Sequence, residues 1–301
     1  MNFNNLKADK IAETIRGQFN FSVDKHEMYI HDHDTFRDVP SGKYALVRDD
    51  NFEIIDGASV TDRYTPHTTD DVLALTDAAS RAFDGEVDLK CHWNNGHFVS
   101  IAPTTAYRRS IYGTNDNIFP RLLIRAGYNG KAFEAALGYW RDLCKNMAML
   151  SMVNGTRVKI KHTHSLRGKI DDLIVQMQGL REGWENLSDT VMAMQNREVN
   201  LAEFLKELYG EPESGSTRSE TIYRKRAESI YTRVWRERKE SGRDLMSFTT
   251  PVVSAWEAFN GVQGYTQHDK SRNGKPQSFQ RMLTALDDKD VTRAAELALA
   301  M

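Results

Sequence analysis

Eight apolar residues recur at alternating intervals of three and four between residues 166 and 195. This is the a/d spacing of a heptad pattern, which places them on one stripe of a helix and predicts packing against another helix. The second helix could come from another copy of the chain or from the chain's own helix, expected at residues 218–240. We call this stripe the heptad seam; it comprises Ile170, Leu173, Met177, Leu180, Trp184, Leu187, Val191 and Met194.

A strand-like segment at residues 157–162 precedes the heptad seam and alternates cations with other side chains. Because side chains alternate across a strand, the cations would share one face. Lys and Arg on such a face suit the phosphates of a nucleic acid, although a solvated edge strand that carries Lys has the same pattern. The predicted phosphate contacts are Arg157, Lys159, Lys161, Arg167 and Lys169.

A second group of cations lies beside aromatic residues earlier in the chain. Proteins that bind single strands combine a cationic groove with aromatic rings on which bases stack. Trp93 precedes an Asn-Asn-Gly turn, where a large ring would be exposed. The group adds Trp93 and Tyr107 as stacking candidates, and Arg108, Arg109, Arg121 and Arg125 as further phosphate contacts.

The net charge of −2 argues against a protein that coats nucleic acid with its whole surface. Binding would instead depend on cations clustered in one part of the chain. Cys91 and Cys144 are too few for a disulfide framework, so we expect small core residues in a reduced compartment. Residues 1–10 lack the apolar stretch of a secretory signal, and no apolar run approaches the length of a membrane span. We expect a soluble protein of a bacterial host cytosol.

Motifs for enzymatic or metal chemistry are weak. His31 and His33, and likewise His162 and His164, stand two apart, but neither pair has a third ligand at a recognisable spacing. No Gly-Lys pair is followed by Ser or Thr as in a phosphate loop, and no nucleophile elbow or dinucleotide fingerprint occurs. We expect a non-enzymatic protein with no cofactor and no metal.

The pattern of strands and turns predicts an α+β fold. Residues 1–165 would form an antiparallel or mixed sheet with hairpins and packed helices, and residues 166–301 a mostly helical region with a linker near 210–217. The expected elements are a helix at 5–16 followed by a polar, histidine-rich connection, strands at 44–48, 52–55, 87–91, 97–101, 119–125 and 157–162, a strand that becomes a helix within 131–150, and helices at 69–83, 218–240 and 278–301.

Several motifs resemble a family found in phages and plasmids, domain of unknown function 932. They are Tyr44-Ala-Leu-Val-Arg48, Phe119-Pro-Arg-Leu-Leu-Ile-Arg125, Arg141-x-x-Cys144-x-Asn146, Val158-x-Ile160-x-His162-Thr163, and Asn260 with Tyr265 and His268. Gly261 departs from the family, which usually has Ala there. The resemblance implies a mobile-element context and makes His162, Cys144, Asn146, Asn260 and His268 positions of interest.

The expected architecture is also similar to that of phage single-strand annealing proteins, which hold one strand in a basic groove beside a hairpin. Fold-level similarity does not by itself establish function. We expect an oligomeric protein that binds single-stranded DNA and promotes annealing or recombination. The alternative is a viral interaction factor that binds a host or phage protein through its helical half.

Overall fold

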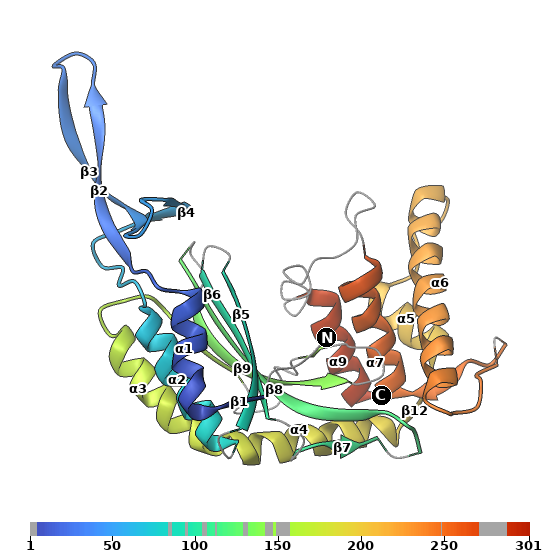
Figure 1. Cartoon of the computed structure of the whole chain (residues 1–301). Helices are drawn as coiled ribbons and strands as arrows, with labels where there is room; N and C mark the ends of the chain where they lie inside the picture. Colours follow the sequence, from blue (N-terminus) through green and yellow to red (C-terminus); the bar gives the residue numbers. More distant parts are fainter. Residues whose placement is uncertain are drawn as a thin grey trace. The chain divides into compact units, whose positions relative to one another are not determined.

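The computed structural model describes residues 5–83, 86–93, 96–103, 107–111, 113–128, 132–141, 147–148, 157–247, 249–270 and 288–301. Its sheets are antiparallel, and its helices lie mostly in the C-terminal half (Figure 1). The predicted α+β class is confirmed.

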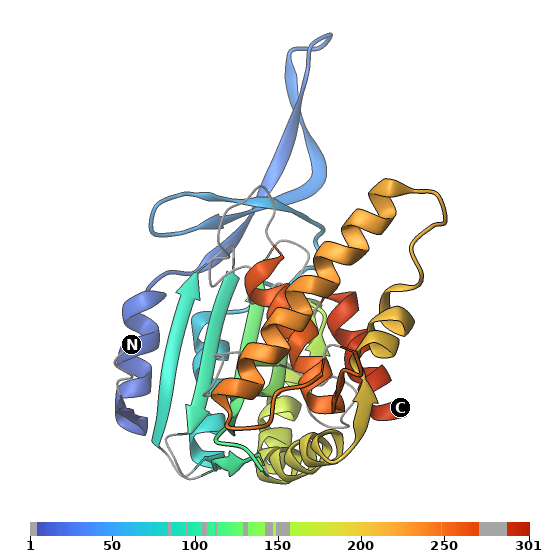
Figure 2. The same ribbon diagram turned by 90° about the vertical axis from the view of Figure 1, so that its right-hand side faces the viewer.

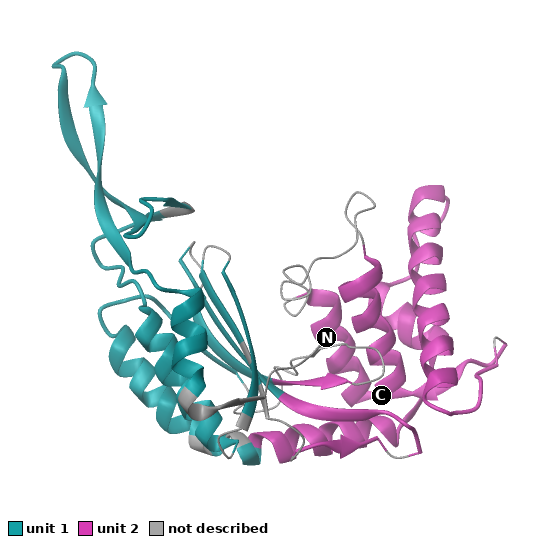
Figure 3. Cartoon of the chain, in the orientation of Figure 1, with its two compact units in different colours: residues 1–106, 121–137, 155–182 teal, residues 107–120, 138–154, 183–301 magenta. Residues whose placement is uncertain are grey.

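The chain forms two compact units, each assembled from three segments that alternate along the sequence (Figure 3). The first unit contains residues 1–106, 121–137 and 155–182, and the second contains 107–120, 138–154 and 183–301. Helix α3 (Leu166–Gln176), which belongs to the helical region in the sequence-based division, lies in the first unit.

The largest sheet has the strand order β1-β5-β6-β8-β9-β10, with β7 paired to β8 and β11 paired to β9. Two of its strands, β8 and β9, begin in one unit and end in the other. The strand bounds are β1 Asn5–Lys7, β5 Glu86–Trp93, β6 Gly96–Pro103, β7 Arg109–Ser110, β8 Asn117–Gly127, β9 Phe133–Arg141, β10 Met147–Ala148 and β11 Arg157–Ile160.

In the first unit, α1 (Ala8–Gln18), α2 (Thr69–Ala82) and α3 pack together beside the sheet (Figure 1). Thr68 and Asp71 begin α2 with a capping box, in which each side chain accepts a bond from the other residue's backbone N–H. Alternate residues of the strands form the apolar face and are fully buried, among them Val87, Val99, Ile101, Leu122 and Ile124.

A separate three-stranded sheet in the first unit consists of β2 (Val23–Asp32), β3 (Arg37–Arg48) and β4 (Ile54–Val60). The end of the β2–β3 ribbon projects away from the rest of that unit (Figures 1 and 2). The sequence predicts a polar connection before Tyr44, and this prediction is wrong. The ribbon's outer part has no core beneath it, so the apolar alternation that marks a half-buried strand is missing.

The second unit is mainly helical, and its long helix α6 packs on α7. The two helices approach closely at Gly261, where a Cβ atom would lie 2.5 Å from Cγ2 of Val234. The remaining elements are the 3₁₀ turn η1 Met177–Gly179, α4 Leu180–Gln195, β12 Glu198–Asn200, α5 Leu201–Tyr209, α6 Thr217–Glu240, β13 Val252–Ser254, α7 Ala255–Gly264, the π-helical turn η2 Tyr265–Asp269 and α9 Lys289–Ala300.

Three predicted elements need correction. The segment 131–150 contains no helix among its described residues, because β9 continues to Arg141 and Met147–Ala148 is again a strand. The first residues of the expected helix at 5–16 pair with β5 as strand β1. Helix α9 begins at Lys289, and residues 278–287 of the expected last helix lie outside the described residues.

Candidate nucleic-acid interface

Four of the predicted phosphate contacts form an exposed cationic surface on the first unit. Lys159 lies on β11, Lys161 follows that strand, and Arg167 and Lys169 lie in the first turn of α3. Among the described residues, no carboxylate lies within ion-pair distance of any of the four. We call this set the β11–α3 surface. Its charges are available to an external anion.

The beginning of α3 adds to the positive potential of the β11–α3 surface. Its N-cap residue, Ser165, makes no side-chain capping bond, and the first turn contains no acidic residue. The N-terminal end of a helix carries a partial positive charge and free N–H groups, which favour phosphate. Here that end lies next to Arg167.

Three other predicted contacts are ion-paired within the first unit. Arg157 and Arg125 share the buried carboxylate of Glu134. Arg121 is buried 3.5 Å from the carboxylate of Asp88. Burial lowers the pKa of Arg121 and raises that of Asp88, while the opposite charge of each partner acts against these shifts. The spacing of these arginines in the sequence did not reveal that each guanidinium group forms an ion pair with a carboxylate of the same unit.

The predicted contacts Tyr107, Arg108 and Arg109 belong to the second unit, so they do not extend the β11–α3 surface within one unit. Arg109 forms an exposed ion pair with Glu185, and Arg108 is exposed. The residues of the predicted single groove therefore belong to two different units.

Trp93 is not an exposed stacking group. Its ring packs edge-on against Phe21, with centroids 4.7 Å apart, and the Arg48 guanidinium lies 5.3 Å from its centroid. It is half-buried against a core cluster that includes Tyr128. The expected exposure is wrong because the N-terminal segment, which carries Phe21, folds over the hairpin.

The first unit also contains three buried histidines that the sequence did not connect. His67 Nε2 lies 2.8 Å from His97 Nδ1, and the His67 and His162 rings are 5.2 Å apart. His162 Nδ1 lies 3.2 Å from the carbonyl oxygen of Thr65, to which it can donate. Burial lowers the pKa of all three imidazoles. The family-motif residue His162 thus fixes the loop before α2.

The heptad seam is covered from within the chain. The seven seam residues whose side chains are described are each at most 4% exposed; the Leu180 side chain lies outside the described part. The 3₁₀ turn η1 interrupts the helix at Met177. The α3 part packs on α2, whereas α6, which the sequence left open as one of two partners, packs on α7. The described side chains of the heptad seam therefore do not present a free surface to another chain.

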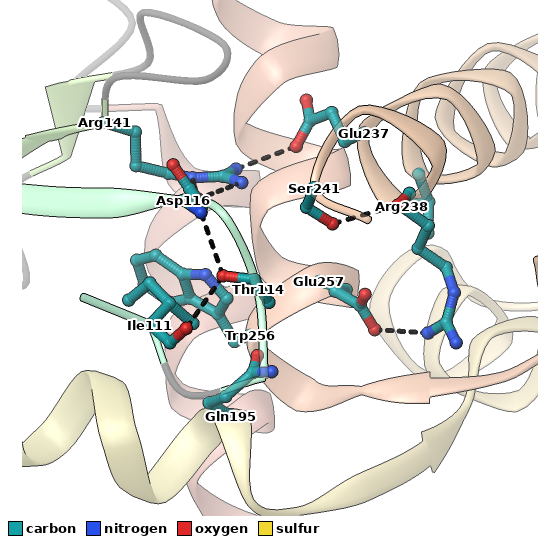
Figure 4. A pocket seen from close by; sticks show the side chains of 11 residues that line it. Ile111, Thr114, Asp116, Arg141, Gln195, Glu237, Arg238, Ser241, Trp256 and Glu257 are labelled. Atoms are coloured by element: carbon teal, nitrogen blue, oxygen red, sulfur yellow. Dashed lines mark hydrogen bonds and ion pairs between the residues drawn. The ribbon is translucent and has the colours of Figure 1, made fainter. Parts of the chain in front are cut away.

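The family-motif residue Arg141 lines a small cavity in the second unit (Figure 4). Arg141 lies between two buried carboxylates, at 2.5 Å from Asp116 and 2.8 Å from Glu237. The Trp256 ring also lines the cavity, and its Nε1–H finds no acceptor among the described residues. The volume open to the centre of a water molecule is about 10 Å³.

That volume has room for about one water molecule. Because Asp116, Arg141 and Glu237 are paired with one another in its lining, the cavity is part of a structural ion network. Asn260, another motif residue, is fully buried and donates its amide to the carbonyl oxygen of Trp256 at 2.8 Å. His268 is partly buried, and Cys144 and Asn146 lie outside the described residues.

Residues 58–297 match the family Domain of unknown function (DUF932). The match covers most of the chain, so the chain belongs to this family. No curated protein and no solved structure matches it. In the described segments no group of three or more His, Cys, Asp or Glu side chains could hold a metal ion, and no described helix is long and apolar enough to cross a membrane.

Proposed function

We propose that this family member binds single-stranded DNA through the β11–α3 surface and, as an oligomer, promotes annealing of complementary strands. One observation gives the proposal its main support. Lys159, Lys161, Arg167 and Lys169 follow one another from a strand into a helix, all exposed and without carboxylate partners in the described part of the chain. Such groups neutralise phosphates without reading sequence.

The ion pairs of three arginines reduce the set of phosphate contacts that the sequence predicts. Arg121, Arg125 and Arg157 would have to leave Asp88 and Glu134 before they could bind phosphate. Breaking a buried pair leaves one charge uncompensated, which costs about 3–5 kcal/mol. We therefore assign phosphate binding to the four exposed cations and a structural role to these three.

The test is binding of a labelled single-stranded oligonucleotide, titrated over salt, by the wild type and by Lys159→Glu/Lys161→Glu. We expect the double variant to bind at least about tenfold more weakly. The negative slope of log K against log salt should become shallower by about 0.7 for each phosphate that the variant no longer neutralises. Both sites are exposed, so thermal stability should not change.

A matched control reverses two exposed cations elsewhere in the same unit, Lys10→Glu/Arg63→Glu, with the same change in net charge. It should retain nearly all of the affinity. Unchanged affinity in Lys159→Glu/Lys161→Glu would reject the assigned surface. A matched duplex tests strand preference, and annealing of two complementary oligonucleotides tests the second part of the proposal.

The alternative function, capture of a host or phage protein through the helical half, loses its main support. It relied on the heptad seam, whose described side chains are buried.

A further inference from the structure

The most exposed apolar surface of the described residues lies at the end of the β2–β3 ribbon. We call residues 27–40 the arm. Its Tyr29, Ile30, Phe36 and Val39 side chains are 57%, 63%, 81% and 49% exposed. Ile30 and Val39 face each other across the two strands. Apolar side chains gathered on a projecting ribbon (Figures 1 and 2) are typical of a surface that binds another macromolecule.

The charge of the arm indicates what kind of partner it can accept. It carries four carboxylates, Glu27, Asp32, Asp34 and Asp38, and one guanidinium, Arg37. The carboxylates are exposed or half-exposed, and Asp38 forms the one histidine ion pair among the described residues of the arm, with His31 Nδ1 2.9 Å away. A nucleic acid would be repelled by this surface. The fitting partner is a protein surface that is cationic and partly apolar.

The chain itself carries such a surface on α6. Residues at spacings of three and four form one stripe of this helix, and its exposed members include four cations, one apolar residue and, at the C-terminal end, the carboxylate of Glu240. Ile222 is 50% exposed between two of the cations. We call this set the α6 stripe; it comprises Arg218, Ile222, Lys225, Arg236 and Lys239.

The dimensions of the two surfaces are compatible. From Arg218 to Lys239 the α6 stripe is about 31 Å long, at about 1.5 Å per residue. The β2 strand from Glu27 to Asp32 spans about 17 Å, at about 3.4 Å per residue. The stripe is therefore long enough to receive one face of the arm, on which Ile30, Asp32 and Val39 lie together, whereas Tyr29 and Asp38 lie on the other face.

The other cationic surface is a poorer complement. No apolar residue of the β11–α3 surface between Lys159 and Lys169 is exposed, whereas Ile222 is 50% exposed on the α6 stripe. On the α6 stripe, Arg236 alone approaches a carboxylate within ion-pair distance among the described residues, and that distance to Glu240 is 4.0 Å.

We propose that the arm of one copy of this protein docks on the α6 stripe of a second copy. Both surfaces are exposed within the single chain, so each is free for an intermolecular contact. The contact joins two different patches, and such a head-to-tail interface builds a ring or a filament. It supplies the oligomer of the proposed function but does not depend on DNA binding.

The experiment is sedimentation of the full-length protein without nucleic acid over a range of concentrations. The wild type should associate beyond a dimer. Two variants, Ile30→Ser/Phe36→Ser in the arm and Arg218→Glu/Lys225→Glu in the stripe, should each lower the association constant at least tenfold. A control, Val175→Ser, removes an equally exposed apolar side chain from α3 and should associate like the wild type.

Mixing the two variants tests the head-to-tail geometry. The arm variant keeps an intact stripe and the stripe variant keeps an intact arm, so an equimolar mixture should form heterodimers and nothing larger. Circular dichroism confirms that both variants are folded. A monomeric wild type, association unaffected by the arm variant, or no complex in the mixture would each overturn the proposal. An arm variant that associates normally but loses DNA affinity would also overturn it.

Discussion

His67 Nε2 and His97 Nδ1 lie 2.8 Å apart in the interior of the first unit, where each side chain is 1% exposed. One ring nitrogen must donate its hydrogen to the other, so the bond requires at least one neutral ring. Burial and the nearby Arg48 lower the pKa of His97 to about 3, and burial holds the pKa of His67 well below its usual value. Both rings are neutral at pH 7.

We expect the first unit to lose stability in mild acid. The unfolded His97 takes up a proton near pH 6.5, whereas the buried ring does not until about pH 3. The free energy of unfolding therefore falls by about 1.4 kcal/mol for each pH unit between those values through His97 alone, and this group has no effect above pH 6.5. Urea titrations at several pH values measure the slope.

The variant His97→Gln can still form hydrogen bonds but cannot titrate. It should be less stable than the wild type at pH 7.5 and should show a shallower loss of stability below pH 6.5. His164→Gln, at an exposed position, is the control and should keep the wild-type slope. Identical slopes in His97→Gln and the wild type would show that this ring is not the source of the acid lability.

Removal of Arg141 should strongly destabilise the second unit. Its guanidinium lies within 2.8 Å of two buried carboxylates, those of Asp116 and Glu237. In Arg141→Met these charges lose a shared partner, and breaking a buried pair in this way costs about 3–5 kcal/mol. Chemical denaturation measures the change. The control Arg109→Met, which breaks an exposed pair with Glu185, should cost less than about 1 kcal/mol. Equal losses in both variants would contradict the assigned network.

The close approach of α6 and α7 predicts that Gly261→Ala is destabilising, although Ala is a better helix former. The new Cβ would lie 2.5 Å from Val234 and 3.1 Å from Ile230, and β-branched side chains have little freedom to move away. The overpacking should cost about 1–3 kcal/mol. Thermal unfolding checks the sign. Gly17→Ala in α1, where a Cβ meets no atom within 4 Å, should instead stabilise the protein by up to about 1 kcal/mol.

Apolar periodicity and turn residues are enough to predict several elements of this fold. The hairpin of β5 and β6, helix α2 and the burial of the heptad seam all follow from apolar periodicity and turn residues. Periodicity shows which face is buried, but it does not show which element covers that face. The sequence therefore left the seam's partner open, and the structure places α2 against α3.

Charge patterns are less informative than apolar ones, because an ion pair joins residues that are distant in sequence. Arg157 is 23 residues from Glu134, and Arg141 is 96 residues from Glu237. The spacing of cations alone could not separate these structural arginines from the exposed Lys159. The arm was missed for a related reason, since a ribbon exposed on both faces needs no apolar alternation.

The alternation of segments between the two units has a consequence for how this gene can change. Each unit is built from three stretches separated by stretches of the other, so no single cut releases either unit whole. A crossover with a related gene at any internal position would replace parts of at least one unit and leave it a mixture of two parents. Where the crossover falls between residues 141 and 237, the buried partners Arg141 and Glu237 come from different ancestors. Successful hybrids should be rare, and the described core should be inherited as one block.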